Sequence, residues 1–197
     1  MNNGRETENK TKKEPFLHSV YDFVELFIIA ICIVFIIFNF AVRLCRVNGP
    51  SMEQTLYNGE LLLISDAFYT PEQGDVIVFH QAGTGSYYNE LIVKRVIATE
   101  GQYVKVLGNG VYVSDDSTVD EADLLPEDDY AYVDGNQIYN TLREPVQVPE
   151  GCLFVMGDNR NHSADSRDGN IGFVDTRRVV GKVLFRITPF DRFGAID

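Results

Sequence analysis

The chain has 197 residues, enough for one domain of ordinary size and a membrane anchor, and 45% of them are hydrophobic. Its 23% charged and 12% aromatic residues are typical of a globular protein and exclude an intrinsically disordered one. The formal net charge is −12 and no stripe of Lys or Arg is present, so nucleic acid is not an expected partner.

A long apolar segment lies near the N-terminus, at residues 23–42, and reads FVELFIIAICIVFIIFNFAV. As a helix it would be about 30 Å long, which matches the hydrocarbon core of a bilayer. A cleavable secretory signal peptide is the alternative, but its apolar region has only about 7–15 residues and precedes a small-x-small site. Here the run is longer and is followed by Arg43 and Arg46. We therefore predict a retained transmembrane helix.

Basic residues flank this segment on both sides, and more of them precede it than follow it. The preceding ones are Arg5, Lys10, Lys12 and Lys13, and the following ones are Arg43 and Arg46. By the positive-inside rule this asymmetry favours a cytoplasmic tail at 1–22 and an extracytoplasmic domain at 43–197.

The residues after the apolar segment are predicted to form strands. Apolar and β-branched runs alternate with turn residues at short intervals, and no run has a helical period. The runs lie at 60–65, 75–80, 91–98, 102–107, 111–113, 146–148, 152–156 and 179–187. Gly108-Asn109-Gly110 supplies the positive φ angles of a tight hairpin turn. The pattern predicts an all-β, mostly antiparallel domain with a barrel or sandwich architecture.

Residues 115–141 differ from the rest of this domain, because they are rich in Asp and Glu and contain no Lys or Arg. We interpret them as a solvated insertion. Calcium binding is the sharper alternative, but the segment contains no Asp-x-Asp-x-Asp-Gly loop to support it.

The three cysteines indicate neither a metal site nor a disulfide framework. Cys32 lies in the apolar segment, and Cys45 and Cys152 can pair only if the fold brings them within bonding distance. We interpret all three as buried or membrane thiols.

A turn that ends in a serine follows the apolar segment closely. Residues 47–52 read VNGPSM, and the Gly-Pro pair fixes a turn and lets the backbone approach closely. Ser51 is therefore expected at the end of a tight connection. The motif alone is equally compatible with an ordinary turn, since serine is common in turns.

A lysine interrupts the apolar run at 91–98. With a period of two, Lys94 shares a face with Ile92 and Val96, and Arg95 lies on the opposite face. Burial on such a face lowers a lysine pKa toward neutrality, and a neutral amine can act as a general base. The alternatives are that this face is solvated, or that Lys94 extends its charge to water.

A charged loop, MGDNRNHSADSR at 156–167, follows another apolar run. Opposite charges this close can form ion pairs that hold a loop rigid, and rigid loops beside a sheet often carry functional residues. A solvated polar turn is the alternative. The charged side chains are Asp158, Arg160, Asp165 and Arg167.

Other hydrolytic chemistries have little support in the sequence. It contains neither a Gly-x-Ser-x-Gly elbow nor a His-Glu-x-x-His zinc helix. A Ser-His-Asp triad would have to use His80 or His162 as its base. We therefore expect no metal and no cofactor.

Taken together, these segments resemble the bacterial type I signal (leader) peptidases of the Gram-positive type, which are serine proteases with a Ser-Lys dyad. The match extends from the apolar segment almost to the C-terminus, and all blocks keep the family's order. The blocks are Gly49-x-Ser51-Met52-x-x-Thr55-Leu56, GDVIVF at 74–79, KRVIA at 94–98, GDNRxxSxDSR at 157–167, and GKVLFR at 181–186 with Pro189-Phe190.

The resemblance implies a membrane-bound endopeptidase that removes N-terminal signal peptides from secreted preproteins at small-x-small sites. It makes Ser51 the nucleophile, Lys94 the general base and Ser163 the residue that holds the lysine amine. Its implied partners are preproteins and the lipid bilayer, and it implies no cofactor. It also implies two structural ion pairs around the site, Asp158 with Arg160 and Asp165 with Arg167.

The chain departs from the family pattern at one position and follows a subset of the family at another. Gln54 stands where the family usually has a proline that stiffens the turn after the nucleophile. Gly49 stands where some members have a serine as oxyanion donor, so the oxyanion hole must use backbone N–H groups, with that of Ser51 as the first candidate.

Two other functions remain open at this point. In one, the chain is a catalytically inactive, membrane-tethered binding or assembly module of the same fold. In the other, it is a Ser-Lys protease that cleaves itself or one dedicated partner. The presence of both Ser51 and Lys94 favours the peptidase, since an inactive copy need not retain them.

Overall fold

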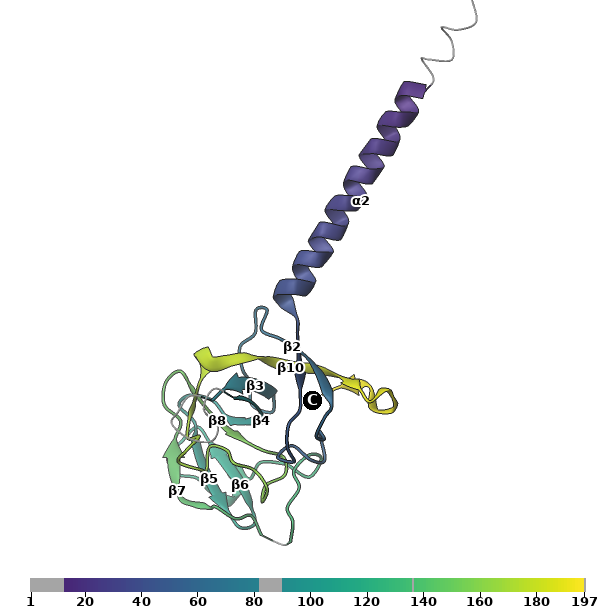
Figure 1. The fold of residues 1–197 in the computed structure, drawn as a ribbon. Coiled ribbons are helices and arrows are strands. Elements are labelled where there is room, and N and C mark those ends of the chain that lie inside the picture. Colours follow the sequence, from purple (N-terminus) through teal and green to yellow (C-terminus); the bar gives the residue numbers. More distant parts are fainter. Residues whose placement is uncertain (1–12, 82–89, 136, 197) are drawn as a thin grey trace, which may run out of the picture. The chain divides into compact units, whose positions relative to one another are not determined.

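The computed structural model describes residues 13–81, 90–135 and 137–196. The chain divides into two compact units, Met1–Ala41 and Val42–Asp197 (Figure 1). Among the described residues, the first unit contains the helix α2 and the second contains the strands.

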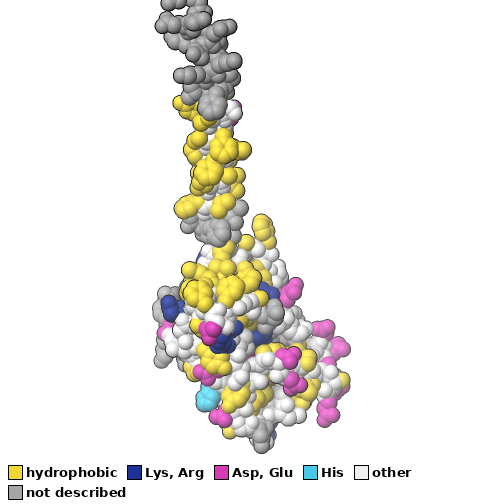
Figure 2. Space-filling model, turned by 90° about the vertical axis from the view of Figure 1, so that its right-hand side faces the viewer, with side chains coloured by type: hydrophobic (Ala, Val, Ile, Leu, Met, Phe, Trp, Pro, Cys, Tyr) yellow, Lys and Arg dark blue, Asp and Glu magenta, His cyan; other side chains and the backbone are white. Residues whose placement is uncertain are grey.

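The first unit is built on the helix α2, Lys13–Ala41. Its stretch His18–Ile36 is long and apolar enough to cross a membrane by length and composition, and none of it is buried within the protein. Figure 2 shows hydrophobic side chains along the middle part of this helix. The segment predicted at 23–42 lies within the helix except for its last residue. The basic residues Arg5, Lys10 and Lys12, on which the predicted orientation partly depends, lie outside the described residues.

The larger sheet of the second unit has eight strands, and every pairing between neighbours is antiparallel. Its order is β1-β2-β10-β3-β4-β8-β9, with β11 added to β10. The strands are β1 Arg43–Arg46, β2 Leu61–Ser65, β3 Val76–His80, β4 Leu91–Ala98, β8 Cys152–Met156, β9 Val174–Asp175, β10 Val179–Thr188 and β11 Gly194–Ala195.

The smaller sheet has three antiparallel strands in the order β6-β5-β7. They are β5 Tyr103–Leu107, β6 Gly110–Ser114 and β7 Leu142–Gln147. β5 and β6 form the predicted hairpin, in which Leu107 pairs with Gly110. The positive φ angles expected at its turn do not occur, because Gly108, Asn109 and Gly110 are not among the residues with positive φ. Three short 3-10 helices complete the unit: η1 Glu121–Asp123, η2 Thr176–Arg178 and η3 Phe190–Arg192.

The prediction of a mostly antiparallel all-β domain with one N-terminal apolar helix is confirmed. The runs predicted at 91–98 and 152–156 coincide with β4 and β8. The sequence did not predict β1, β9 or β11. Three clusters of buried apolar side chains form the core, and each includes residues of β3, β4 or β8.

The acidic segment 115–141 connects β6 to β7 and is not purely solvated, which corrects the prediction. Most of its carboxylates are exposed, and Figure 2 shows groups of acidic side chains on the surface of this unit. However, Val119 and Ile138 are buried, and the carboxylate of Glu127 is bonded to a buried arginine. The segment therefore contributes to the packed structure.

The three cysteines are free thiols. Cys45 belongs to the cluster around β2, whereas Cys152 packs against the cluster of the smaller sheet, so the pairing of these two residues left open above does not occur. Cys32 lies exposed on α2.

Candidate active site

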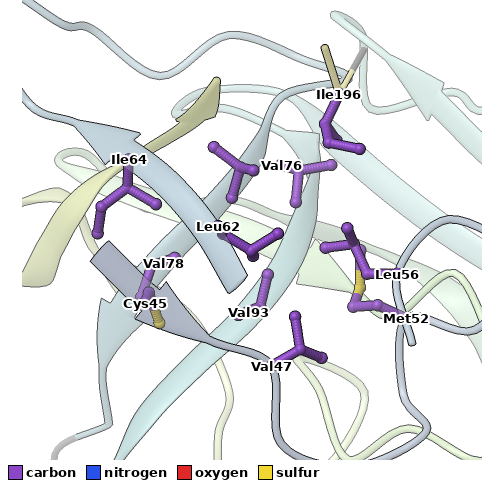
Figure 3. Close-up of a cluster of buried hydrophobic side chains, with 11 residues drawn as sticks. Cys45, Val47, Met52, Leu56, Leu62, Ile64, Val76, Val78, Val93 and Ile196 are labelled. Atoms are coloured by element: carbon purple, nitrogen blue, oxygen red, sulfur yellow. The ribbon is translucent and has the colours of Figure 1, made fainter. Parts of the chain in front are cut away.

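Ser51 lies in the connection between β1 and β2, in a turn anchored on both sides. Gly49 has φ +95°, a conformation that favours glycine. After Ser51, the N–H groups of Thr55 and Leu56 donate to the Met52 carbonyl. Met52 and Leu56 point into the apolar cluster (Figure 3) and are almost fully buried. The two side chains therefore fix the backbone that carries Ser51.

Lys94 lies in the middle of β4 and is only 3% exposed. Its Nζ donates to Ser51 Oγ at 2.7 Å and to the Val93 carbonyl at 3.0 Å. The alternatives of a solvated face and of a charge extended to water are wrong, because every residue from Val93 to Ala98 is buried. The structure thus brings the two residues of the expected dyad into direct contact.

Burial lowers the pKa of Lys94 to about 8, well below that of a lysine in water. The carboxylates of Asp165 and Asp158 oppose this shift, and the guanidinium of Arg167 adds to it. The amine is therefore neutral in a substantial fraction of molecules at mildly alkaline pH. A neutral amine has a lone pair that can accept a proton from a hydroxyl.

The charged loop after β8 packs directly against the serine turn. A Cβ at Gly157 would overlap both the Ser163 Oγ and the Ser51 carbonyl oxygen, so only glycine fits there. The Asn159 N–H donates to the Ser51 carbonyl at 3.0 Å, and its Nδ2 donates to the Pro50 carbonyl at 3.2 Å. The loop therefore holds the backbone on both sides of the Ser51 peptide.

One of the two ion pairs implied for this loop occurs. Arg167 donates to both carboxylate oxygens of Asp165, at 2.8 and 2.7 Å, and both side chains are buried. A further carboxylate contact comes from the N–H of Gly157 at 3.1 Å. Asp165 is thus held between its arginine and the loop backbone.

The other implied pair, Asp158 with Arg160, is wrong. Arg95 donates to both carboxylate oxygens of Asp158, at 3.0 and 2.9 Å, while Arg160 binds both oxygens of Glu127 at 2.6 Å. The register explains the difference: Arg95 pairs with Met156 across β4 and β8, and Asp158 follows Met156 by two residues on the same side. Arg95, for which the sequence indicated no role as a base, therefore has a structural role at this site.

Ser163 lies beside the dyad, next to Gly157, but its hydrogen bond is a long one to the Ala164 carbonyl at 3.5 Å. The bonds that the structure gives Lys94 run to Ser51 and Val93. The expected contact between Ser163 and the lysine amine is not among them, and its role stays a prediction.

The histidines considered as rival bases are both exposed. Within the described part of the chain, no hydrogen bond joins His80 or His162 to Ser51, whereas Lys94 makes one. His162 lies 3.5 Å from the Asp134 carboxylate. No group of three or more potential metal ligands is present among the described residues.

A groove of about 290 Å³ opens onto Ser51 and Lys94. One wall contains residues 47–50, and the other contains Leu91–Val93 at the start of β4. β3 pairs with the first part of β4, from Leu91 to Arg95, and β8 pairs with its second part, from Arg95 to Ala98. The first half of β4 therefore has a strand edge that faces no other strand of the described structure.

A family model for signal peptidases, described as "Signal peptidase, peptidase S26", matches residues 20–188. The chain belongs to this family.

Relatives of known name agree with this assignment to the signal peptidase family. The chain is similar to the signal peptidase I of Bacillus licheniformis, with 33% identity over 97% of this chain and 100% of that protein. It is 37% identical to the signal peptidase I of Bacillus caldolyticus, over 84% and 90% of the two chains. A crystal structure of a signal peptidase I from Enterococcus faecalis V583 aligns with 26% identity and a TM-score of 0.38, over 58% of this chain and 97% of that one.

The position where this signal peptidase family member departs from the expected motif has an unusual backbone. Gln54 has φ +87°, which the ring of a proline cannot adopt because it fixes φ near −65°. The glutamine side chain is exposed. The turn after Ser51 therefore takes a path that the usual proline would not permit.

Sequence reasoning missed three residues that hold the site. Asn159 was quoted in the motif without a role, Arg95 was placed opposite Lys94 without a partner, and Glu127 was not distinguished from the exposed acids of its segment. Asn159 could have been noticed as an amide directly between two opposite charges, Asp158 and Arg160. The other two depend on strand register and on a contact 33 residues apart in the chain.

Proposed function

We propose that this member of the signal peptidase family is a membrane-bound serine endopeptidase that removes N-terminal signal peptides from preproteins. Ser51 is the nucleophile and Lys94 is the general base. The observation that carries the assignment of roles is the 2.7 Å hydrogen bond between a serine hydroxyl and a buried lysine amine. A serine with a lysine base is a known variant of the catalytic triad.

In this mechanism the neutral amine of Lys94 takes the proton of the Ser51 hydroxyl. Oγ attacks the scissile carbonyl and forms a tetrahedral intermediate, which collapses to an acyl-enzyme while protonated Lys94 gives its proton to the leaving amine. Water activated by Lys94 then attacks the acyl-enzyme and releases the signal peptide.

The oxyanion of both tetrahedral intermediates is stabilised by backbone, with the N–H of Ser51 as donor. This N–H donates to no acceptor among the described residues, whereas the Ser51 and Pro50 carbonyls are both bonded. Such a fixed donor contributes substantially to the rate, since removing one typically costs about 10²–10³ in kcat.

The substrate binds as an added β-strand in the groove. The edge of Leu91–Val93 that lacks a strand partner supplies main-chain hydrogen bonds, and residues 47–50 form the opposite wall. The two small side chains of the small-x-small site, both of which precede the scissile bond, occupy two shallow pockets.

The helix α2 anchors the enzyme, with the N-terminal tail in the cytoplasm and Val42–Asp197 outside. Ser51 follows the predicted span by nine residues, which at ~3.3 Å per residue is a reach of at most ~30 Å. The nucleophile therefore works close to the bilayer surface, where the cleavage site of a secretory precursor emerges.

Cleavage of a precursor with an Ala-x-Ala site by the detergent-solubilised protein tests the proposal. Ser51→Ala and Lys94→Ala are each expected to abolish product, because one removes the nucleophile and the other removes the base. Ser114→Ala and Lys105→Ala, in the smaller sheet, are matched controls and are expected to cleave normally.

Three results would contradict the proposal. A folded wild type that cleaves none of several precursors would point to an inactive binding module or to a protease with one dedicated partner. Activity that survives Ser51→Ala would exclude the nucleophile. Activity that survives Lys94→Ala would exclude Lys94 as the base and leave His80 and His162 as the candidate bases.

A further inference from the structure

Asn159 holds the peptide group that carries the proposed oxyanion donor. Its Nδ2 donates to the Pro50 carbonyl at 3.2 Å, and its own N–H donates to the Ser51 carbonyl at 3.0 Å. The Pro50 carbonyl and the Ser51 N–H belong to the same peptide group. This peptide bond is trans, so the two groups point in opposite directions within one plane. A bond that fixes the direction of the Pro50 carbonyl therefore also fixes the direction of the Ser51 N–H.

A contribution to stability does not explain why an amide side chain is buried at position 159. It is 2% exposed, and its Oδ1 has no hydrogen-bond partner within the described structure. A buried acceptor without a partner costs free energy. The Pro50 carbonyl does not need Asn159 to be satisfied, because the Glu53 N–H also donates to it, at 3.0 Å. The amide is thus retained at a cost, as is common for residues that serve a site.

The acidic segment holds Asn159 from the other side. The Tyr132 N–H donates to the Asp158 carbonyl at 2.7 Å, and the Arg160 N–H donates to the Tyr132 carbonyl at 2.8 Å, so the backbone of the segment lies along the loop. Glu127 binds the guanidinium of Arg160 with both oxygens.

The same arginine also holds its own loop. Its Nε donates to the Gly157 carbonyl at 3.0 Å, and its side chain is fully buried. Without the carboxylate of Glu127, the charge of Arg160 would be left buried and uncompensated, which is strongly unfavourable. Glu127 therefore helps to fix the part of the loop that carries Arg160.

We propose that Asn159 is a positioning residue that orients the Ser51 N–H toward the oxyanion, and that Glu127 of the acidic segment fixes Asn159 through Arg160. This inference rests on the proposed function. It assigns to residues 115–141 a part in the reaction, although none of the described residues in this range forms a hydrogen bond with the dyad.

The substitution Asn159→Leu tests the first step. It removes the amide at nearly constant volume, so a merely structural role predicts a change in stability with unchanged kcat. A positioning role predicts a fall in kcat of about 10–100-fold, with KM close to that of the wild type, because the oxyanion exists only after attack. Asn159→Asp, which keeps the shape but cannot donate to Pro50, is expected to behave in the same way.

A double-mutant cycle tests the second step. Glu127→Gln is expected to lower kcat about tenfold in the wild type but less than twofold in the Asn159→Leu background, because both changes act through one peptide group. Asp129→Asn is the matched control: it removes the same charge from the same segment, at an exposed side chain that makes no ion pair with the described residues, and should leave kcat unchanged. If Glu127→Gln does not fold, Arg160→Lys replaces it in the cycle, since it keeps the charge and loses the two-pronged contact.

The outcomes separate this inference from the proposed function. If the wild type cleaves, Ser51→Ala does not, and Asn159→Leu keeps kcat within twofold, then the positioning role is wrong and the dyad stands. If kcat losses from Glu127 and Asn159 multiply in the double variant, the connection between them is wrong. If the wild type does not cleave any precursor, the proposed function itself fails.

Discussion

At the scale of single residues, Lys94 is held between two opposing influences. Burial favours its neutral form, and the carboxylates of Asp165 and Asp158 favour its charged form. Each of these acids is paired with its own arginine, which weakens its effect on the amine. The result is an amine that can take up and give back a proton near physiological pH, as the proposed mechanism requires.

We expect kcat/KM to rise with pH through a midpoint near 8, because the base acts only when Lys94 has lost its proton. Below the midpoint, the rate should fall about tenfold for each unit of pH. A pH-rate profile of precursor cleavage from 6 to 10 measures this directly. A profile that is flat over this range would show that Lys94 is not the base.

The lowered pKa of Lys94 also makes the free energy of unfolding depend on pH, and measuring this dependence serves as a control for the pH-rate profile. Between pH 8 and the unfolded pKa of 10.5, the folded state binds fewer protons than the unfolded state, so this group's contribution to stability rises with pH across that window. Lys94→Met should remove both this dependence and the activity. At pH 7 it should raise the free energy of unfolding, since it no longer buries a charge.

Gln54 supplies a second prediction at this scale. Its φ of +87° is unfavourable for any residue with a Cβ, and its side chain is exposed. Gln54→Gly is therefore expected to stabilise the protein by about 1 kcal/mol, and Gln54→Pro to destabilise it by more than that, as measured by thermal unfolding. Glu72→Gly is the control at an exposed position without positive φ, and it should destabilise. Equal stability of the glycine and proline variants at position 54 would contradict the backbone path described for this turn.

At the scale of elements, the strands that the sequence predicted are those whose own residues specify them. β4 and β8 are predominantly apolar strands, interrupted by Lys94 and Arg95 in β4. Most of their residues are buried, and their bounds were predicted correctly. β1 reads RLCR, which carries no such signal, and it forms a strand because it pairs with β2. Short strands of this kind depend on tertiary contacts that no local pattern contains.

The candidate site was predictable to the extent that its residues lie in distinctive segments. Ser51 and Lys94 were both named from the sequence, and the structure brings them together. The ion-pair partner of Asp158 was not predicted from the sequence. A charged side chain in a loop can reach several partners, and only the register of β4 against β8 selects Arg95. Glu127 could not be distinguished from its exposed neighbours until the loop that it binds was in place.

At the scale of the whole molecule, the β-rich unit contains its own core. All of the buried apolar residues of the described structure lie between Cys45 and Ile196, and none belongs to α2. A unit of this size with its own core is expected to fold alone. The helix serves to place the enzyme rather than to complete it.

We therefore expect a protein truncated to residues 42–197 to remain folded and to cleave a soluble peptide substrate with a kcat close to that of the full chain. Cleavage of precursors embedded in vesicles should become much less efficient, because enzyme and substrate no longer share a surface. Thermal unfolding and parallel assays on the two substrates measure both effects. Aggregation of the truncated protein, or loss of cleavage of the soluble peptide, would contradict this division of roles.

The burial of Met52 and Met156 has a consequence for chemical durability. Met52 follows Ser51 directly, Met156 precedes the loop at Gly157, and the two are 1% and 0% exposed. Oxidation to the sulfoxide would place a polar group inside the core on each side of the site. Peroxide reaches these sulfurs only when the β-rich unit opens, so the packing that positions the nucleophile also shields it from oxidative inactivation.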